Sequence, residues 1–145
     1  MLYSEFKRER SFVGRLPFNK DLISSIDGFC KEKGVEMAVF SVIGAVSSVT
    51  LGYFDQRQKV YVSFKKEVHL EIASCSGNIS KKDGNPFVHA HIVLTDDKGN
   101  AIGGHLFSET IVFAGEFYIQ ELSGNAFERE YDPQTGLMLW NIRDT

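Results

Sequence analysis

Three of the chain's four histidines are gathered in one stretch, 87-FVHAHIVLTDDKGNAIGGHLF-107. His89 and His91 are one residue apart, and His105 follows after a run of turn-forming residues. Neutral imidazole is a borderline ligand that suits zinc, copper, nickel or iron. Whether these side chains can bind one ion depends on whether the backbone brings them together.

The loop between the histidines predicts how two strands pair. Asp97-Lys98-Gly99 resembles a three-residue hairpin connection, in which a type I turn is followed by a glycine in the left-handed region. The pairs that this turn predicts are Asp96 with Asn100, His91 with His105, and His89 with Phe107. A two-residue turn at Asp97-Lys98 is the alternative, and it would move His105 to the opposite face and leave the glycine without a role.

Because side chains alternate along a strand, the three-residue turn places His89, His91 and His105 on one face. Opposed Cβ atoms lie about 4.5–5.5 Å apart, and imidazoles can converge from there on one ion at about 2.0–2.1 Å per nitrogen. The sequence therefore predicts a metal site, with zinc as the default and one coordination position open to water. The competing interpretation is three ordinary polar residues on a half-exposed strand.

The other face of the predicted hairpin is wholly apolar and should pack under a helix. Its residues are Val88, Ala90, Ile92, Leu94, Ile102 and Leu106. The histidines then lie on the outer face, together with Phe87, Val93 and Phe107. Gly103 and Gly104 precede His105, and paired glycines in a strand indicate close approach of a backbone or a ligand.

One long helix is predicted, over about residues 20–33. Apolar residues recur there at three- and four-residue spacing, Asn19 is the expected N-cap with Asp21 in the first turn, and Gly34 is suited to the residue after the helix. The remainder favours strands. The expected strands lie within 2–16 and at 37–43, 46–54, 60–64, 66–72, 74–80, 110–122 and 137–140. Gly44 is expected to interrupt one of them, 81–86 is expected to be a loop, and a turn is expected at 131–133.

Composition fits one globular α+β domain over residues 1–145, with a mainly antiparallel sheet and one main helix. The formal net charge of −3 argues against non-specific binding of nucleic acid, which draws on Lys and Arg. The two cysteines form no CxxC motif, and no signal peptide or bilayer-spanning segment is visible, so a cytoplasmic protein without membrane contact is expected.

Three further residues are candidates for parts of the site. His69 alternates with Glu71 on a predicted strand and is expected at the surface or an interface rather than as a fourth ligand. Glu71 could accept a hydrogen bond near a metal or act as a general base, although nothing in the sequence places it there. Cys75 is expected to be a small buried apolar residue.

The order of the segments resembles the plant-and-prokaryote conserved (PPC) domain family, which in plants follows AT-hook motifs in nuclear DNA-binding proteins. The resemblance covers about residues 10–130, and HLEIASCSGNIS and HAHIVLTDDKGNAIGGHL are its most specific elements. It implies an α+β sandwich, a homotrimer, and a histidine triad that binds a zinc-like metal. The triad positions of the family are occupied by His89, His91 and His105.

Three functions stay open on the sequence. One is a metal-binding oligomeric module with a regulatory or ligand-sensing role, which could include association with DNA through partner proteins. A second is a zinc-dependent enzyme, of hydrolase or lyase type, that uses water. A third is direct DNA binding, but the AT-hook core Arg-Gly-Arg-Pro is absent, since Gly14-Arg15 is followed by Leu16 and Pro17.

Overall fold

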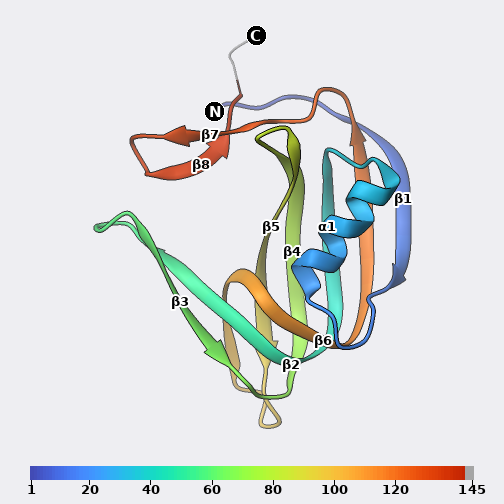
Figure 1. Ribbon diagram of the computed structural model, residues 1–145, viewed down its shortest axis with the longest axis vertical. Coiled ribbons are helices and arrows are strands. Elements are labelled where there is room, and N and C mark those ends of the chain that lie inside the picture. The colour runs from blue at the N-terminus through green and yellow to red at the C-terminus, as the bar shows by residue number, and fades with distance from the viewer. Residues whose placement is uncertain (143–145) are drawn as a thin grey trace.

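The computed structural model of the protein describes residues 1–142 (Figure 1). Within that range α1, Leu22–Lys33, is the only helix. The strands are β1 Lys7–Arg15, β2 Ala38–Asp55, β3 Val60–Lys66, β4 Leu70–Lys82, β5 Asn85–Thr95, β6 Ala101–Ser123, β7 Arg129–Asp132 and β8 Leu137–Trp140. The predicted α+β class, mainly antiparallel with a single helix, is confirmed.

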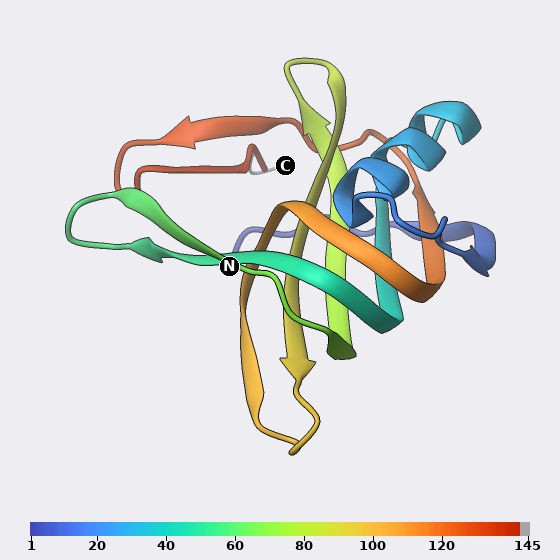
Figure 2. The same ribbon diagram turned by 60° about the horizontal axis from the view of Figure 1, so that its bottom comes forward.

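Six strands form one sheet, in the order β1-β6-β5-β4-β2-β3, and β6 also pairs with β2. The antiparallel ladders β2–β4, β4–β5, β5–β6 and β6–β2 therefore form a closed cycle. β7 and β8 form a separate two-stranded sheet. Figure 2 shows the β5–β6 hairpin extending beyond the rest of the sheet.

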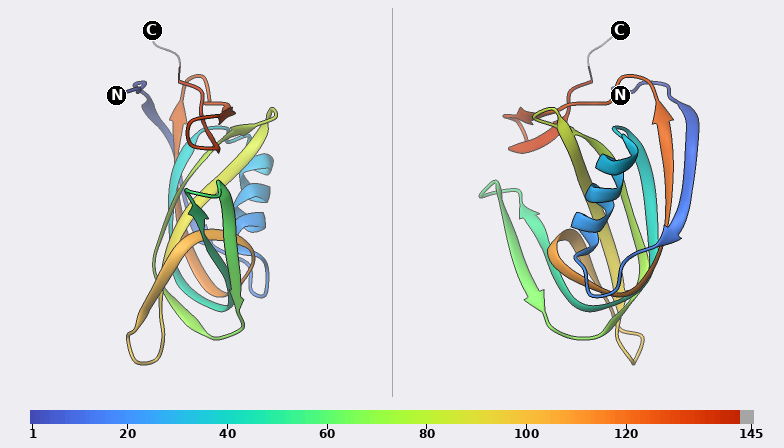
Figure 3. Two further views of the ribbon diagram at one scale, coloured as in Figure 1. Left: turned by 90° about the vertical axis from the view of Figure 1, so that its left-hand side faces the viewer. Right: turned by 45° about the vertical axis from the view of Figure 1, so that its right-hand side comes forward.

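The helix packs on one face of the sheet (Figure 3). It buries Leu22, Ile26 and Cys30 completely. The hairpin residues that join the same core are Val88, Ala90, Ile92, Leu94 and Leu106, with Ile102 partly buried against it. The predicted apolar face is therefore confirmed as the core face.

The N-cap of the helix is Asp21, so the expectation of Asn19 was wrong. One carboxylate oxygen of Asp21 accepts a hydrogen bond from Ser24 N at 2.8 Å, and the other accepts from Thr110 N at 3.0 Å. Asn19 instead has a φ of 58° and lies before the helix. Asp21 thus satisfies a free N–H of the helix and links the helix to β6. Gly34 ends the helix with a φ of 66°, as predicted.

Gly44 does not interrupt a strand, and the prediction of a break there was wrong. β2 continues through it with a bulge between Val42 and Gly44. Gly44 has a φ of 141°, and a Cβ there would lie 2.1 Å from Ala114 O. The glycine therefore allows β2 to remain paired with β6 where any larger residue would collide with it.

Other predicted strand limits also shift. The segment predicted at 66–72 is interrupted at residues 67–69, which separate β3 from β4. The predicted loop 81–86 shrinks to two turn residues, Asp83 and Gly84, with φ of 52° and 75°, since paired positive φ values make a tight hairpin turn. The predicted strand 110–122 is the second part of the longer β6, and the opening strand is shorter than 2–16. Alternating hydrophobicity reports the buried face of a strand better than its ends.

The 12-residue α1 is the single helix of residues 1–142, and it is neither long nor apolar enough to cross a bilayer.

Candidate metal centre

The loop at the tip of the hairpin has the predicted three-residue form. Asp96 N donates to Asn100 O at 3.1 Å, and Gly99 N donates to Asp96 O at 3.1 Å. Gly99 has a φ of 80°, in the left-handed region that favours glycine. His91 therefore pairs with His105, as predicted, and the two-residue alternative is wrong.

The expected pairing of His89 with Phe107 is wrong. The β5–β6 ladder ends at His91 and His105, and β6 then continues beside β2, where Phe107 pairs with Thr50. A Cβ on Gly104 would lie 2.6 Å from Gly52 O, so the glycine permits this close approach of β6 to β2. The predicted close approach of a backbone at the glycine pair is thereby confirmed.

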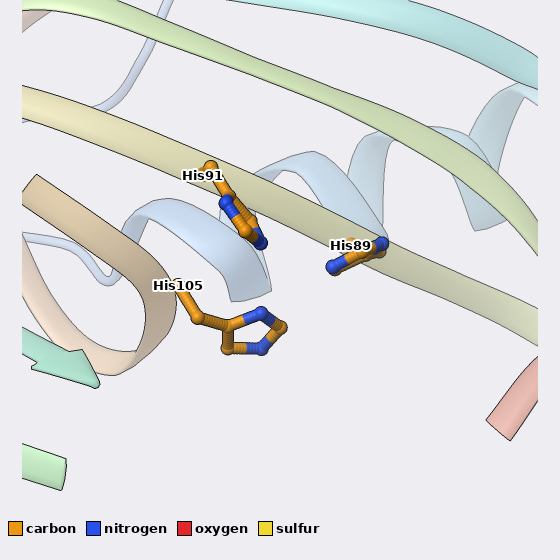
Figure 4. A group of neighbouring side chains, drawn as sticks. All are labelled: His89, His91 and His105. Carbon is orange, nitrogen blue, oxygen red and sulfur yellow. The ribbon is translucent and has the colours of Figure 1, made fainter. Parts of the chain in front are cut away.

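The three histidine side chains nevertheless converge (Figure 4). One ring nitrogen from each of His89, His91 and His105 lies within 4.8 Å of the others. The ring centroids are 5.3 Å apart for His89 and His91, 5.0 Å for His89 and His105, and 5.3 Å for His91 and His105. His91 is exposed, whereas the other two are partly buried.

This donor set fits a transition metal. Two imidazole nitrogens on one tetrahedral zinc lie about 3.4 Å apart, given bonds of about 2.0–2.1 Å. The nitrogens lie within 4.8 Å of one another, so the imidazoles would draw closer together on binding an ion. Three imidazoles on rigid strands would leave one tetrahedral position for a further ligand.

The surroundings keep two of the histidines neutral. Burial lowers the pKa of His89 to about 4, helped by the positive charges of Arg129, His105 and His91. Burial also lowers the pKa of His105 to about 4, helped by His91 and Arg129. Neutral imidazole is the form that binds a metal, so near neutral pH these two rings need not release a proton first.

Aromatic rings hold His105 in place. The ring centroid of His105 lies 4.9 Å from that of Tyr61 and 4.7 Å from that of Phe107. Tyr61 and Phe107 also contact each other at 5.5 Å between centroids. Phe107 was predicted beside the histidines, whereas Tyr61 reaches them from β3, which no local pattern relates to the hairpin.

A cavity of about 490 Å³ opens beside the histidines. Residues of α1 and of strands β2 to β8 line it, among them His89 and His105. Its charged lining residues within 1–142 are Lys59, Lys82 and Arg129. Sequence reasoning missed Arg129, because a single arginine after the main sheet carries no motif that relates it to the hairpin.

The other candidate residues of the sequence lie outside the centre. His69 is exposed in the connection between β3 and β4. Glu71 pairs with Thr95 and does not line the histidine cavity. Cys75 is buried, and burial raises the pKa of its thiol to about 12, in line with its predicted role as an apolar residue.

Solved structures of similar proteins cover nearly the whole chain. A metal-containing protein from Archaeoglobus fulgidus is 48% identical, with a TM-score of 0.93 over 97% of this chain and 99% of that chain. A plant- and prokaryote-conserved protein from Pyrococcus horikoshii is 36% identical, with a TM-score of 0.92 over 100% of both chains. A protein from Bacteroides thetaiotaomicron, named as a candidate DNA-binding protein, is 28% identical, with a TM-score of 0.85 over 94% of this chain and 97% of that chain.

Curated relatives are much longer than this chain. The bifunctional protein GlmU of Synechococcus sp. strain JA-3-3Ab is 29% identical over 135 residues, which are 92% of this chain. The chain spans about a fifth of the length of the relative, because the match covers 20% of it. The model of the Plants and Prokaryotes Conserved (PCC) domain matches residues 3–123. The chain therefore belongs to the Plants and Prokaryotes Conserved domain family.

Proposed function

We propose that the protein binds one divalent transition metal, with zinc as the first choice, through His89, His91 and His105. The observation that carries this proposal is the convergence of three ring nitrogens within 4.8 Å of one another. The metal-containing relative from Archaeoglobus fulgidus, at 48% identity, supports it. The role that we propose is a metal-dependent binding module of regulatory type.

A cobalt titration tests this proposal. Cobalt(II) substitutes for zinc, and a tetrahedral site gives stronger visible absorption than hydrated cobalt. We expect saturation at about one cobalt per chain, and loss of the visible bands in H91A. H69A is the matched control, because His69 lies outside the centre and its removal should leave the titration unchanged. Equal titrations of H91A and H69A would contradict the proposal.

The second candidate is a zinc-dependent enzyme of hydrolase or lyase type. The observation that favours it is the cavity of about 490 Å³ that opens on His89 and His105, since enzymes bind small substrates in pockets of this size. A bound zinc ion would supply Lewis-acid activation. The chain's own aromatic residues in the cavity wall would position the substrate. Zinc-dependent turnover on an ester and phosphoester panel, lost in H105A, would favour this candidate over a binding module.

Assembly into a homotrimer is part of the proposal. Pairing across β1, β6, β2, β4 and β5 places Val13, Tyr118, Ser41, Ser76 and His91 in one row on one face. That face exposes large apolar side chains, including Val13 at 81% and Tyr118 at 42% of their maximum. Exposed apolar patches of this kind are typical of subunit contacts. Light scattering should give three times the chain mass of 16.3 kDa.

Association with DNA enters through the name of the Bacteroides thetaiotaomicron relative. With a net charge of −3, we propose that any such association runs through partner proteins rather than direct contact. A gel shift over a range of salt concentrations separates the two routes. Binding by the purified protein that weakens steeply with salt would identify direct contact with phosphates.

A further inference from the structure

Arg129 is a buried cation in the wall of the histidine cavity. Its side chain lies on β7, and the residue is 8% exposed. Its guanidinium donates to Ser80 Oγ at 2.9 Å, Asn78 Oδ1 at 2.8 Å and Met138 O at 3.0 Å. These acceptors are all neutral, and they use three of the five N–H donors that an arginine has.

No carboxylate of residues 1–142 forms an ion pair with Arg129. Its other neighbours are the rings of Phe87 and Trp140, whose centroids lie 5.1 and 5.7 Å from the guanidinium carbon. Buried charges in proteins are normally paired, because removing an ion from water costs several kcal/mol. The guanidinium is thus held rigidly, largely desolvated, and without a counter-ion in the described part of the chain.

The rest of the cavity wall is complementary to an anion with an apolar body. Lys59 and Lys82 add positive charge, and no acidic residue of the described chain contributes to the lining. Most of the remaining lining residues are aromatic or aliphatic. The large apolar residues among them include Phe54, Tyr61, Phe87, Phe107, Leu137 and Met138. An acidic protein that gathers three cations and no carboxylate around one cavity has a local field opposite to its net charge of −3.

We propose that this cavity binds a small organic carboxylate with an apolar body, and that Arg129 pairs with the carboxylate. The apolar body lies against the aromatic wall, with its far end toward His89 and His105. The inference rests on the proposed metal centre only for a second anchoring point at the histidines. Arg129 is the specificity-determining residue, because a planar guanidinium with free N–H donors matches a carboxylate in geometry and charge.

Calorimetric titration with matched probe pairs tests this inference. The probes are phenylacetate beside phenylacetamide and hexanoate beside hexanamide, each pair alike in shape and different in charge. Zinc-loaded and metal-free wild-type protein are compared with R129Q, which removes the charge and retains an amide donor for Ser80. K98Q is the control, because it makes the same change of net charge at an exposed loop residue away from the cavity.

We expect at least one carboxylate to bind zinc-loaded wild-type protein at least tenfold more tightly than its amide. This preference should fall to about threefold or less in R129Q and be unchanged in K98Q. A smaller preference should persist in metal-free wild-type protein. If circular dichroism shows R129Q to be unfolded, the metal-free wild-type protein tests the inference instead. A preference for the carboxylate over the amide there supports it, and equal binding of the two contradicts it.

Two results would overturn the inference: no preference for either carboxylate in wild-type protein, or a preference that R129Q retains in full. Failure of the metal proposal is recognised separately, because the protein would then bind no zinc in the same calorimeter. The comparison on metal-free protein would still report on Arg129 in that case.

Discussion

The two faces of the β5–β6 hairpin are made by the same two strands but differ in burial and in side-chain chemistry. One face carries Ile92 and Leu94, which are 1% and 0% exposed and pack in the core with α1. The other carries His89 and His91, one residue away along the same strand, facing a cavity and solvent. Burial of the first face fixes the register that brings the second face's histidines together. Folding and metal binding should therefore be separable by substitutions one residue apart.

The largest expected effect comes from the core face. Leu94→Ala removes a fully buried side chain and should lower the free energy of unfolding by about 3 kcal/mol, through lost burial and the cavity left behind. Urea denaturation in the presence of a chelator measures this loss of free energy of unfolding. His91→Ala is the comparison on the other face, and because His91 is exposed its cost without metal should be below about 0.5 kcal/mol. Similar losses in the two variants would contradict the division between faces.

Metal should stabilise through the histidine face alone. A ligand that binds only the folded state at a concentration 100 times its Kd adds about 2.7 kcal/mol to the free energy of unfolding. Zinc should therefore raise the thermal midpoints of the wild-type protein and of L94A. The corresponding increases in the free energy of unfolding should be similar in the two proteins. In H91A the increase should vanish. A zinc-induced rise that survives in H91A would point to a binding site elsewhere.

Acid should destabilise the metal-free protein through the same face. The folded-state pKa values of His89 and His105 are about 4, below the ordinary value near 6.5, because both rings are partly buried. Between those two pH values the unfolded chain binds more protons, so stability falls as the pH drops from about 6.5 to about 4. After allowance for solvent screening we expect a loss of about 2 kcal/mol in total.

Urea midpoints at pH 7 and pH 4.5, with chelator, measure this loss. The double variant H89Q/H105Q has no imidazole at these positions and should lose clearly less stability over the same interval. An equal loss in the double variant would assign the acid sensitivity to other groups.

The smallest expected effect tests how the helix is attached to the core face. Asp21→Ala removes the N-cap and the hydrogen bond to Thr110 N, and should cost about 1–2 kcal/mol. Asn19→Ala, which changes the residue first expected to be the cap, should cost less. Because neither Asp21 nor Asn19 lines the histidine cavity, zinc affinity should be the same in both variants. Zinc affinity that falls in D21A would show that the two faces are coupled.

The sequence predicted the parts of the site that depend on local chemistry. Asp97-Lys98-Gly99 encodes its turn through the left-handed conformation of one glycine, and that turn is enough to predict the register of His91 and His105. The apolar alternation of β5 likewise identifies the face that packs under the helix. In both cases the signal and the structure lie within a few residues of each other.

The parts that were missed depend on contacts between distant segments. Gly44 looks like a strand breaker until Ala114 is known to lie against it. Arg129 and Tyr61 reach the histidine cavity only because β7 and β3 fold back toward the β5–β6 hairpin, and neither carries a local signal of that arrangement. Asp21 rather than Asn19 caps the helix through Ser24 N, and its second carboxylate oxygen accepts from Thr110 N, a contact that no local pattern predicts.

The most direct test of the metal centre is the zinc content of tag-free protein by plasma mass spectrometry. Wild-type protein, H105A and H69A are loaded with zinc, freed of excess metal and measured together. We predict about one zinc per chain in the wild type and in H69A, and none in H105A. Wild-type protein without zinc after loading, or H105A with as much zinc as the wild type, would contradict the claim that His89, His91 and His105 form the metal centre.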